Sequence, residues 1–277
     1  MGIIRDAERQ LASSIRNQPM IIAYLELGKV AIKLDQPAKA IESYNSGLEV
    51  FPSEATLKIG IARVHDLLNE SDISFNLYSE TLLIDNNNIE SIACVANHHF
   101  YTNQPEIALI YYKRLVQVGV NSAELWNNLG LCCFYASQYD MSLSCFERAL
   151  AMSDDTNSAD IWYNIGQVSI AVGDLGLAYQ SFKIAISADS NHSESFNNLG
   201  VLELRKNNIE QAKSNFTSAV KLSPFYFEPL YNGALLAYKI GDYQESFFLV
   251  NEALKVFPEH SDSKDLLGLL KESFLKL

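Results

Sequence analysis

Cysteine is scarce in this chain of 277 residues, and the four cysteines that occur follow no recognisable pattern. Cys94, Cys132, Cys133 and Cys145 include no C-x-x-C pair, which argues against a zinc ribbon or a dithiol redox motif. Adjacent Cys132 and Cys133 point in different directions from a helix, so we interpret them as buried, inert thiols rather than a reactive pair. Four unpatterned cysteines in a chain of this length favour a reducing, cytoplasmic compartment.

Basic residues and long apolar runs are also in short supply. Lysine and arginine number 21 against 33 acidic residues, and the formal net charge is −12. This balance argues against binding to nucleic acid or docking on anionic lipid, because both need basic side chains. There is no apolar run of about 18 residues and no signal peptide, so we expect an intracellular protein with no direct membrane insertion.

Catalytic and metal-binding signatures are missing as well. The sequence has no G-x-S-x-G, G-x-G-x-x-G, P-loop or H-E-x-x-H motif, so we predict that the chain is not an enzyme and binds no cofactor. His65 and His99 lie 34 residues apart and, with Cys94 and His98, form a weak candidate metal site. The favoured interpretation is that these histidines replace a packed aromatic residue, and we predict no metal.

What the sequence does have is one spacing that recurs seven times: two small residues twelve positions apart, then a bulky residue four positions later. Successive copies are 34 residues apart, except for one step of 36 between Gly130 and Gly166. A fixed period of this length is the signature of a repeat array. The first small residues are Gly28, Ala62, Ala96, Gly130, Gly166, Gly200 and Ala234; the second are Ala40, Ser74, Ala108, Ser142, Ala178, Ala212 and Ser246; the bulky residues are Tyr44, Tyr78, Tyr112, Phe146, Phe182, Phe216 and Val250.

Each copy predicts two short helices joined by a turn. In the fourth copy, Trp126, Gly130 and Cys133 share one helical face, and Ser142, Phe146 and Ala149 share the next. We expect the paired helices to approach closely at the small residues, while the bulky residue packs against the following layer. Glycine at the turn ends a helix in Gly173-Asp174 and Gly241-Asp242, and proline stops a helix between copies at Pro52, Pro224 and Pro258.

The fold prediction is an all-α, right-handed solenoid of antiparallel helix pairs. Residues 3–17 are predicted as the second helix of a truncated repeat, so we expect further sequence upstream, and 262–275 as a C-terminal capping helix. A two-residue insertion is placed in the loop around 154–157. Acids that open first helices (Glu124, Asp160, Glu194 and Glu228) are interpreted as complementing helix dipoles. The seven predicted repeats are 21–54, 55–88, 89–122, 123–158, 159–192, 193–226 and 227–260.

These positions resemble the tetratricopeptide repeat (TPR), whose pattern is W-x2-LG-x2-Y followed by A, F, A and P. Trp126-x2-Leu129-Gly130 and Trp162-x2-Ile165-Gly166 carry it most directly. The segments 127–150, 104–115 and 196–206 resemble more narrowly the tetratricopeptide repeat protein 8 family of Bardet–Biedl syndrome proteins. That family contributes a subunit to the BBSome, a coat-like complex that carries membrane-protein cargo to and from primary cilia.

The resemblance implies a scaffold rather than a catalyst. Its expected partners are other BBSome subunits, with ciliary membrane-protein cargo bound indirectly and an Arf-like small GTPase contacted by other subunits. It implies a cytoplasmic protein at the cilium, basal body and centrosomal region. A homo-oligomer is not expected.

The candidate binding residues line the first helices of the repeats, which form the concave face of a TPR array. An asparagine column could grip the backbone of an extended segment through its amides, or merely bond a neighbouring helix. The Phe-Tyr pairs could anchor a partner or pack between helices. The candidates are Asn128, Asn164, Asn198, Asn232, Phe100, Tyr101, Phe134, Tyr135, Tyr231 and Tyr238.

The sequence also bears on two other TPR functions. A chaperone-tail clamp needs basic groove residues, and Lys29 and Lys33 have no matching set in later repeats. The alternative to the scaffold is a TPR substrate-recognition arm of a protein-modifying enzyme such as a protein sugar transferase, which the asparagine column keeps open.

Overall fold

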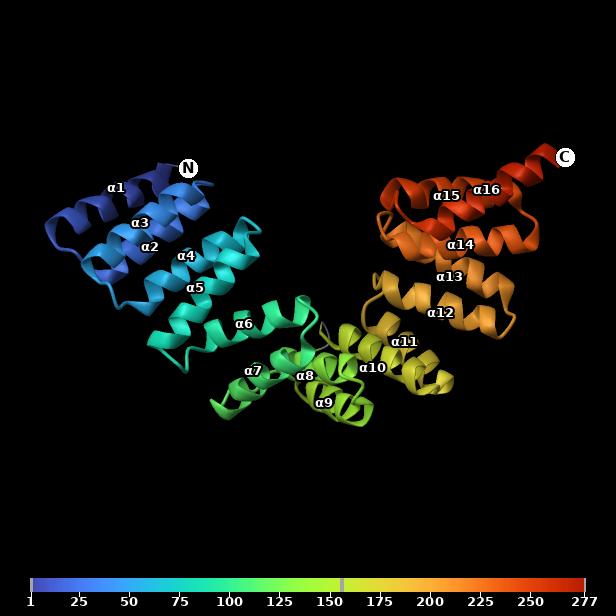
Figure 1. Cartoon of the computed structure of the whole chain (residues 1–277), viewed down its shortest axis with the longest axis horizontal. Helices are drawn as coiled ribbons and strands as arrows, with labels where there is room; N and C mark the ends of the chain where they lie inside the picture. Colours follow the sequence, from blue (N-terminus) through green and yellow to red (C-terminus); the bar gives the residue numbers. More distant parts are fainter. Residues whose placement is uncertain (1, 155–156, 277) are drawn as a thin grey trace. The chain divides into compact units, whose positions relative to one another are not determined.

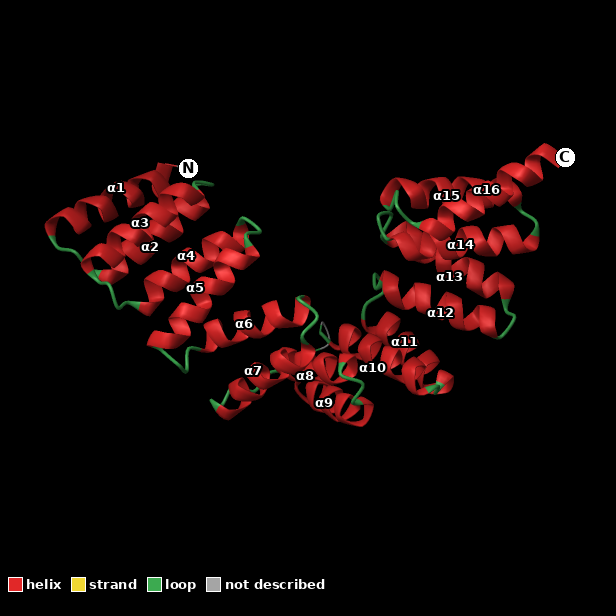
Figure 2. Cartoon of the chain, viewed as in Figure 1, coloured by secondary structure: helices red, strands yellow, loops and turns green. Residues whose placement is uncertain are grey.

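The computed structural model describes residues 2–154 and 157–276, and these residues form helices joined by short loops, with no strand among them (Figure 2). The all-helical fold predicted from the repeat spacing is therefore confirmed. The helices are α1 Gly2–Asn17, α2 Ile21–Lys33, α3 Pro37–Val50, α4 Ala55–Leu67, α5 Ser71–Ile84, α6 Ile89–Tyr101, α7 Pro105–Gln117, α8 Ala123–Tyr135, α9 Tyr139–Met152, α10 Ser158–Val172, α11 Leu175–Ala188, α12 Ser193–Arg205, α13 Ile209–Leu222, α14 Phe227–Ile240, α15 Tyr243–Val256 and α16 Ser261–Lys276.

Consecutive helices pair into hairpins, from α2 with α3 through to α14 with α15 (Figure 1). Within each compact unit, second helices pack against the first helix of the next hairpin, as α3 does on α4 and α13 on α14. The chain forms two compact units, one of residues 1–121 with 135–138 and the other of 122–134 with 139–277. Within each unit, the core is a series of small clusters between layers.

The small and bulky residues of the repeat meet inside one hairpin. A β-carbon built on Gly130 would lie 2.5 Å from Cε1 of Phe146, and Gly166 and Gly200 have the same relation to Phe182 and Phe216. The ring thus occupies the volume that a side chain on the first helix would need. The ring of Phe146 also packs against Ile161 and Ile165 of the next hairpin, so it fills the space between layers as the sequence predicted.

The turn inside every hairpin contains a residue in the left-handed region. Gly173 and Gly241 have φ of 87°, as their position after a helix predicts. The other five turns place a short polar residue there, with φ between 57° and 62°. Asparagine and aspartate tolerate this region better than most residues because their side chains bond locally. The five residues are Asp35, Asn69, Asn103, Ser137 and Asn207.

The loops between hairpins end one helix, and several of them also cap the next. Pro52, Pro224 and Pro258 each lie two residues beyond the last residue of a second helix, where proline cannot continue it. At five of these loops, a side chain caps the following first helix by accepting a hydrogen bond from a backbone N–H, and the residue type varies. Such caps satisfy donors that the first turn leaves unpaired. The capping residues are Glu54, Asn88, Ser122, His192 and His260.

A single helix packs against the first hairpin and another against the last. α1 packs against α2, and α16 packs against α14 and α15. Leu266 and Leu270 of α16 are buried against Ala234 and Val250, which covers the last hairpin. No helix in the described ranges combines the length and apolarity needed to cross a bilayer.

Candidate protein-binding surface

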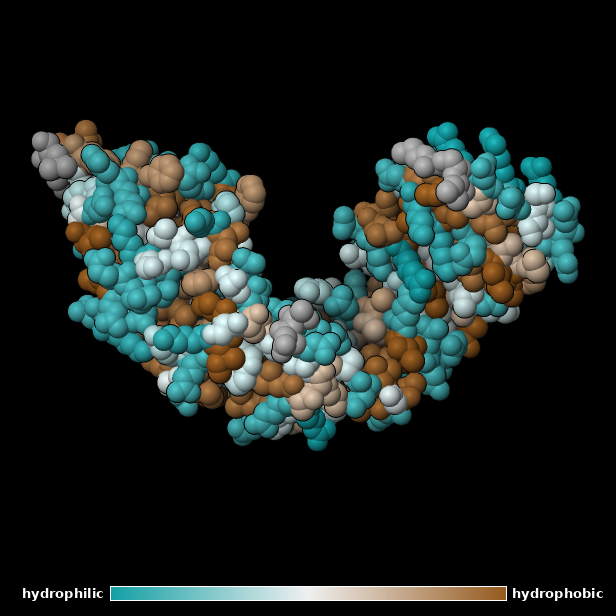
Figure 3. Space-filling model, turned by 180° about the vertical axis from the view of Figure 1, so that it is seen from behind, coloured by the Kyte–Doolittle hydropathy of each residue, from teal (hydrophilic) through white to brown (hydrophobic). Residues whose placement is uncertain are grey.

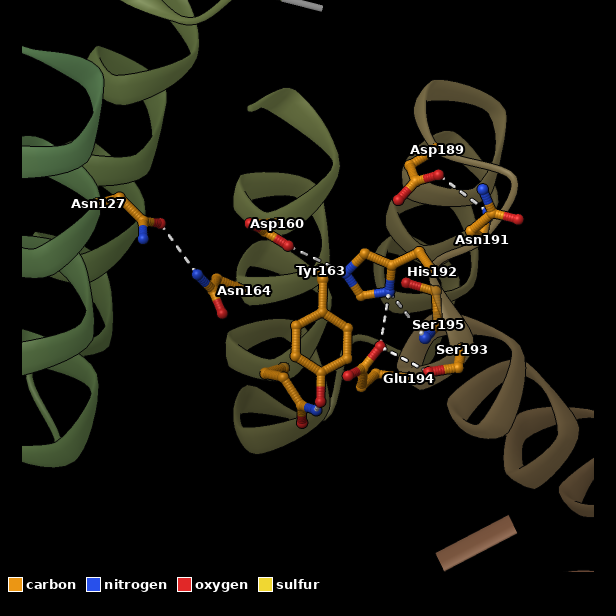
Figure 4. Close-up of polar contacts among 11 residues, drawn as sticks. Asn127, Asp160, Tyr163, Asn164, Asp189, Asn191, His192, Ser193, Glu194 and Ser195 are labelled. Carbon is orange, nitrogen blue, oxygen red and sulfur yellow. Dashed lines mark hydrogen bonds and ion pairs between the residues drawn. The ribbon is translucent and has the colours of Figure 1, made fainter. Parts of the chain in front are cut away.

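Two of the predicted asparagines form hydrogen bonds between layers. Asn164 of α10 donates from Nδ2 to Oδ1 of Asn127 in α8, with 2.9 Å between the two atoms (Figure 4). Asn232 of α14 donates in the same way to Asn197 of α12, also at 2.9 Å. Both donors are half-buried. These two amides therefore bond a neighbouring first helix, which is one of the two roles that the sequence allowed for the asparagine column.

Asn198 completes this part of the column differently. Its Oδ1 accepts a long hydrogen bond of 3.4 Å from Nδ2 of the adjacent Asn197. Its own Nδ2 is buried, and the hydroxyl of Tyr163 is a nearby polar group that interacts with the Asn198 side chain without a well-formed hydrogen bond. Asn128 lies half-buried at the corresponding position of α8. The four asparagines thus share a register on the helices without sharing one bonding role.

The Phe-Tyr pairs place their two rings in different environments. Tyr101 and Tyr135 have 78% and 60% of their surface exposed, whereas the phenylalanines are half-buried. The Phe100 ring contacts both tyrosines, with ring centroids 5.6 and 5.5 Å apart and the planes nearly perpendicular. Phe134 packs beside Tyr139 in the cluster around Phe146. The tyrosines are therefore the members of the pairs that are exposed to solvent.

Leu67 extends this exposed surface by one repeat. It occupies the same repeat position as Tyr101 and Tyr135, at 34-residue steps, and 64% of it is exposed. Hydrophobic residues interrupt the hydrophilic surface over both units in the space-filling view (Figure 3). Single exposed apolar residues are ordinary, but three at one repeat position form an extended candidate contact. We call Leu67, Tyr101 and Tyr135 the exposed apolar column.

The remaining aromatic candidates pack within the last hairpin. Tyr231 stacks on Phe227 and meets the edge of His260, with centroids 6.1 and 4.9 Å apart. Burial raises the pKa of Tyr231, which keeps its hydroxyl neutral. Tyr238 lies against Tyr243, 5.6 Å between centroids, in the same cluster as the capping helix. Their contacts are those of packing residues.

The histidines of the weak metal candidate bond to the hairpin turns. Nδ1 of His65 lies 2.6 Å from Oε2 of Glu70, and Nδ1 of His99 lies 2.9 Å from Oε1 of Gln104. His98 stacks on Phe75 with centroids 4.1 Å apart. Among the described residues, no group of three or more potential ligands is close enough to hold a metal ion.

Cys132 and Cys133 are buried, and Cys94 and Cys145 are half-buried. Burial raises the pKa of Cys132 to about 12 and also raises that of Cys94, so both thiols are protonated at neutral pH. A protonated thiol is a poor nucleophile and a poor ligand. Cys133 is 1% exposed, next to Cys132 in α8.

The sequence reasoning missed His192, which joins two hairpins (Figure 4). The ring is 8% exposed; Nε2 lies 3.3 Å from Oδ1 of Asp160, and Nδ1 lies 3.5 Å from Oε2 of Glu194. Nδ1 also accepts the backbone N–H of Ser195, which caps α12. Burial acts to lower the pKa of His192, but the bond to Asp160 and nearby carboxylates raise it overall.

Asp160 and Glu194 therefore do more than complement helix dipoles. The bond to His192 lowers the pKa of the Asp160 carboxyl, and the same bond raises the pKa of His192, so each partner favours the charged form of the other. The signal available in the sequence was positional: His192 occupies the place where Asn88 and Ser122 cap their helices.

The chain matches known proteins in three comparisons. Tetratricopeptide repeat models match residues 123–155 and 21–54, 159–192 and 193–226. Tetratricopeptide repeat protein 8 of Mus musculus is 45% identical over 278 residues, covering 100% of this chain and 54% of that protein. The BBSome complex member BBS4 of Bos taurus is 27% identical over 175 residues, 62% of this chain and 33% of that protein.

A solved structure agrees on the fold alone. The crystal structure of the APC/C hetero-tetramer Cut9-Hcn1 matches with a TM-score of 0.70 at 13% identity, covering 96% of this chain and 52% of that one. The match to the mouse relative includes all of this chain, which spans about half the length of that protein.

Proposed function

The chain is a tetratricopeptide repeat protein that resembles tetratricopeptide repeat protein 8, and from this premise we propose that it is a non-catalytic scaffold subunit of a BBSome-type complex. The observation that carries the proposal is the 45% identity to the mouse relative along the whole chain. Weaker similarity to a relative named as a BBSome complex member supports the same assignment. The proposed role is the transport of membrane-protein cargo to and from primary cilia.

The proposed mechanism is geometric. Paired helices present the same repeat positions at regular intervals, so side chains on successive hairpins contact successive parts of one partner segment. The exposed apolar column supplies such contacts on α4, α6 and α8. Other subunits are the proposed partners, cargo is bound through them, and the proposed location is the cytoplasm around the basal body and cilium.

Purification of the tagged, full-length protein from ciliated cells tests the assignment. Mass spectrometry of the bound proteins should recover other BBSome subunits. Recovery of chaperones alone would overturn the proposal, because a scaffold subunit should not leave its complex during purification.

The exposed tyrosines provide a sharper test of the surface. We predict that the double variant Tyr101→Ser with Tyr135→Ser loses at least tenfold in recovery of one or more partner subunits, since exposed aromatic rings are frequent interface anchors. Its melting temperature should stay within a few degrees of the native value, because both side chains are largely exposed.

The matched control is Leu83→Ser, which removes a side chain that is 87% exposed but lies on the second helix α5. It should leave recovery unchanged. Equal partner recovery by the tyrosine double variant and the native protein would exclude these tyrosines from the interface.

The asparagine column is proposed as a second contact for an extended segment, with Asn198 as its most informative member. Nδ2 of Asn198 has a hydrogen to donate, which a backbone carbonyl of a bound segment would accept once the side chain turns toward it. Asn198→Ala should therefore reduce partner recovery, with only a small loss of stability from the long hydrogen bond to Asn197. Asn164→Ala breaks an existing bond to Asn127, so it should lower stability as well.

A substrate-recognition arm of a protein sugar transferase is the alternative function. Its support is the asparagine column, and two of those amides already bond neighbouring helices. Co-purification of a glycosyltransferase in place of BBSome subunits would favour this alternative.

A further inference from the structure

One repeat lacks a side chain that all the others have. In each first helix, a bulky aliphatic residue stands immediately before the small residue of the repeat, except in α14, where Gly233 precedes Ala234. The other positions are buried or half-buried. Packing in the interior leaves few voids, so a missing aliphatic side chain has to be filled or left open. The residues at the other positions are Leu27, Ile61, Val95, Leu129, Ile165, Leu199 and Leu267.

The space over Gly233 is open to the surface. It is a pocket of about 160 Å³ between the second helices α13 and α15, with α14 beneath it. Its lining is mostly apolar and includes Phe216, Leu236, Leu249 and Phe248. Leu249 leans partly over the glycine, since a β-carbon on Gly233 would lie 3.3 Å from its Cδ1. We call this space the Gly233 pocket.

The preceding layer shows what the glycine changes. There, Leu199 stands in place of Gly233, and Asn215 and Ser214 stand where α15 has Leu249 and Phe248. Phe248 has 63% of its surface exposed at the rim of the pocket. An exposed ring beside an apolar pocket is a costly arrangement in water, so both changes favour contact with another apolar group.

Acidic residues outnumber basic ones around Lys213 at the pocket wall. Lys213 and Glu245 line the pocket as an ion pair, and the carboxylates of Glu210 and Asp242, outside the lining, act on the same lysine. Three acids against one base leave a local formal charge of −2, in a chain whose net charge is −12. A basic segment would approach this rim with a favourable potential.

We propose that the Gly233 pocket is a docking site for one large apolar side chain, of phenylalanine or leucine size, on a partner segment that carries lysine or arginine on both sides of it. An engineered apolar cavity of about 150 Å³ holds a benzene ring, so a pocket of this volume accommodates one such side chain. The pocket lies on second helices and is separate from the exposed apolar column. The proposal does not depend on which complex contains the protein.

The test uses the full chain and a defined probe, the fluorescein-labelled peptide Lys-Lys-Phe-Lys-Lys, followed by fluorescence anisotropy. The native protein should bind this peptide at least tenfold more tightly than Lys-Lys-Ala-Lys-Lys and than Glu-Glu-Phe-Glu-Glu. Gly233→Leu, which restores the residue of the other repeats, should abolish the preference for phenylalanine. It should not unfold the protein, because the nearest atom is the mobile end of Leu249.

A second variant and a control separate binding from folding. Phe248→Ser, which copies Ser214 of the preceding repeat, should weaken binding of the phenylalanine peptide. Ile110→Ser removes the exposed side chain at the corresponding position of α7, where Val95 replaces the glycine, and should have no effect. Melting curves should show all three variants folded.

Two results would overturn the proposal. One is equal affinity of the native protein for the phenylalanine and alanine peptides. The other is sedimentation of the native chain as a dimer that Gly233→Leu converts to a monomer, which would assign the pocket to a second copy of the chain.

Discussion

At the scale of single residues, an aromatic ring in several hairpins occupies the space that a side chain on the facing glycine would need. The β-carbon missing from Gly166 would lie 2.5 Å from Phe182, a distance that real side chains do not tolerate. The glycine is therefore needed for space rather than for an unusual backbone angle, since it lies within helix α10.

We predict that Gly166→Ala lowers the free energy of unfolding by about 1–3 kcal/mol, because it overpacks the hairpin. Urea denaturation followed by circular dichroism measures the change. Gly176→Ala is the matched control, since its new β-carbon would meet only Oδ1 of Asp174 at 3.4 Å. The control should be neutral or stabilising by up to about 1 kcal/mol. Equal losses in both variants would refute the steric explanation.

The turn residues give a second prediction at this scale. Ser137 has φ of 58° without the local bonding that favours asparagine or aspartate there. Ser137→Gly should raise the free energy of unfolding by about 0.5–1 kcal/mol, and Gly173→Ala should lower it by about 1 kcal/mol. Both changes are measured by thermal and urea denaturation. A loss of stability in Ser137→Gly together with a gain in Gly173→Ala would show that the left-handed backbone conformation does not determine the stability of these turns.

At the scale of elements, His192 joins helix α12 to helix α10. The neutral ring accepts the N–H of Ser195, and the charged ring can turn the same nitrogen toward Glu194. Its raised pKa means that folding favours the charged form. This contribution is fully present below the unfolded pKa of 6.5 and is lost as pH rises through the higher folded pKa.

We therefore predict that the native protein exceeds His192→Asn in stability by a larger margin at pH 6 than at pH 8.5. Asparagine keeps a cap on α12 but cannot take the charge. Urea denaturation at the two pH values measures the difference. Asp160→Asn should flatten the pH dependence of the native protein in the same experiment, and an unchanged margin across this range would contradict the assignment.

Helices were predictable from the sequence, whereas the contacts between them were only partly so. Gly130, Ser142 and Phe146 fixed the hairpin because one steric requirement recurs at a constant spacing. The bond from Asn164 to Asn127 and the bridge from His192 to Asp160 depend on how far one helix slides past another. The 34-residue spacing of the repeat gives no information about that shift of one helix along another. For the same reason, the sequence did not predict that Tyr101 is exposed while the adjacent Phe100 is half-buried.

At the scale of the whole molecule, stability is distributed along the chain rather than held in one centre. Each cluster joins neighbouring hairpins, as Leu270 joins α16 to Ala234 and Val250. In such an array, a local defect destabilises its neighbours first.

We predict that Leu270→Ala, at a position with 0% exposure, raises amide exchange in α14, α15 and α16 and leaves exchange in α2 to α5 unchanged. The local loss should be about 2–5 kcal/mol, because the substitution leaves a cavity. Hydrogen–deuterium exchange with mass spectrometry resolves the two regions. A uniform increase over the whole chain would instead indicate one cooperative unit.

The hydrogen bonds between layers require particular hairpins to be neighbours, so the order of the hairpins matters as well as their spacing. Asn232 finds an amide at Asn197, but the residue at that register one hairpin earlier is Tyr163. Removing residues 193–226 would preserve the period and every glycine–aromatic pair of the remaining hairpins, yet it would bring Asn232 against a phenol. Repeats with the same spacing are thus not interchangeable, because each forms hydrogen bonds with a particular neighbour. This limits how such a chain can lose, gain or exchange a hairpin during its evolution.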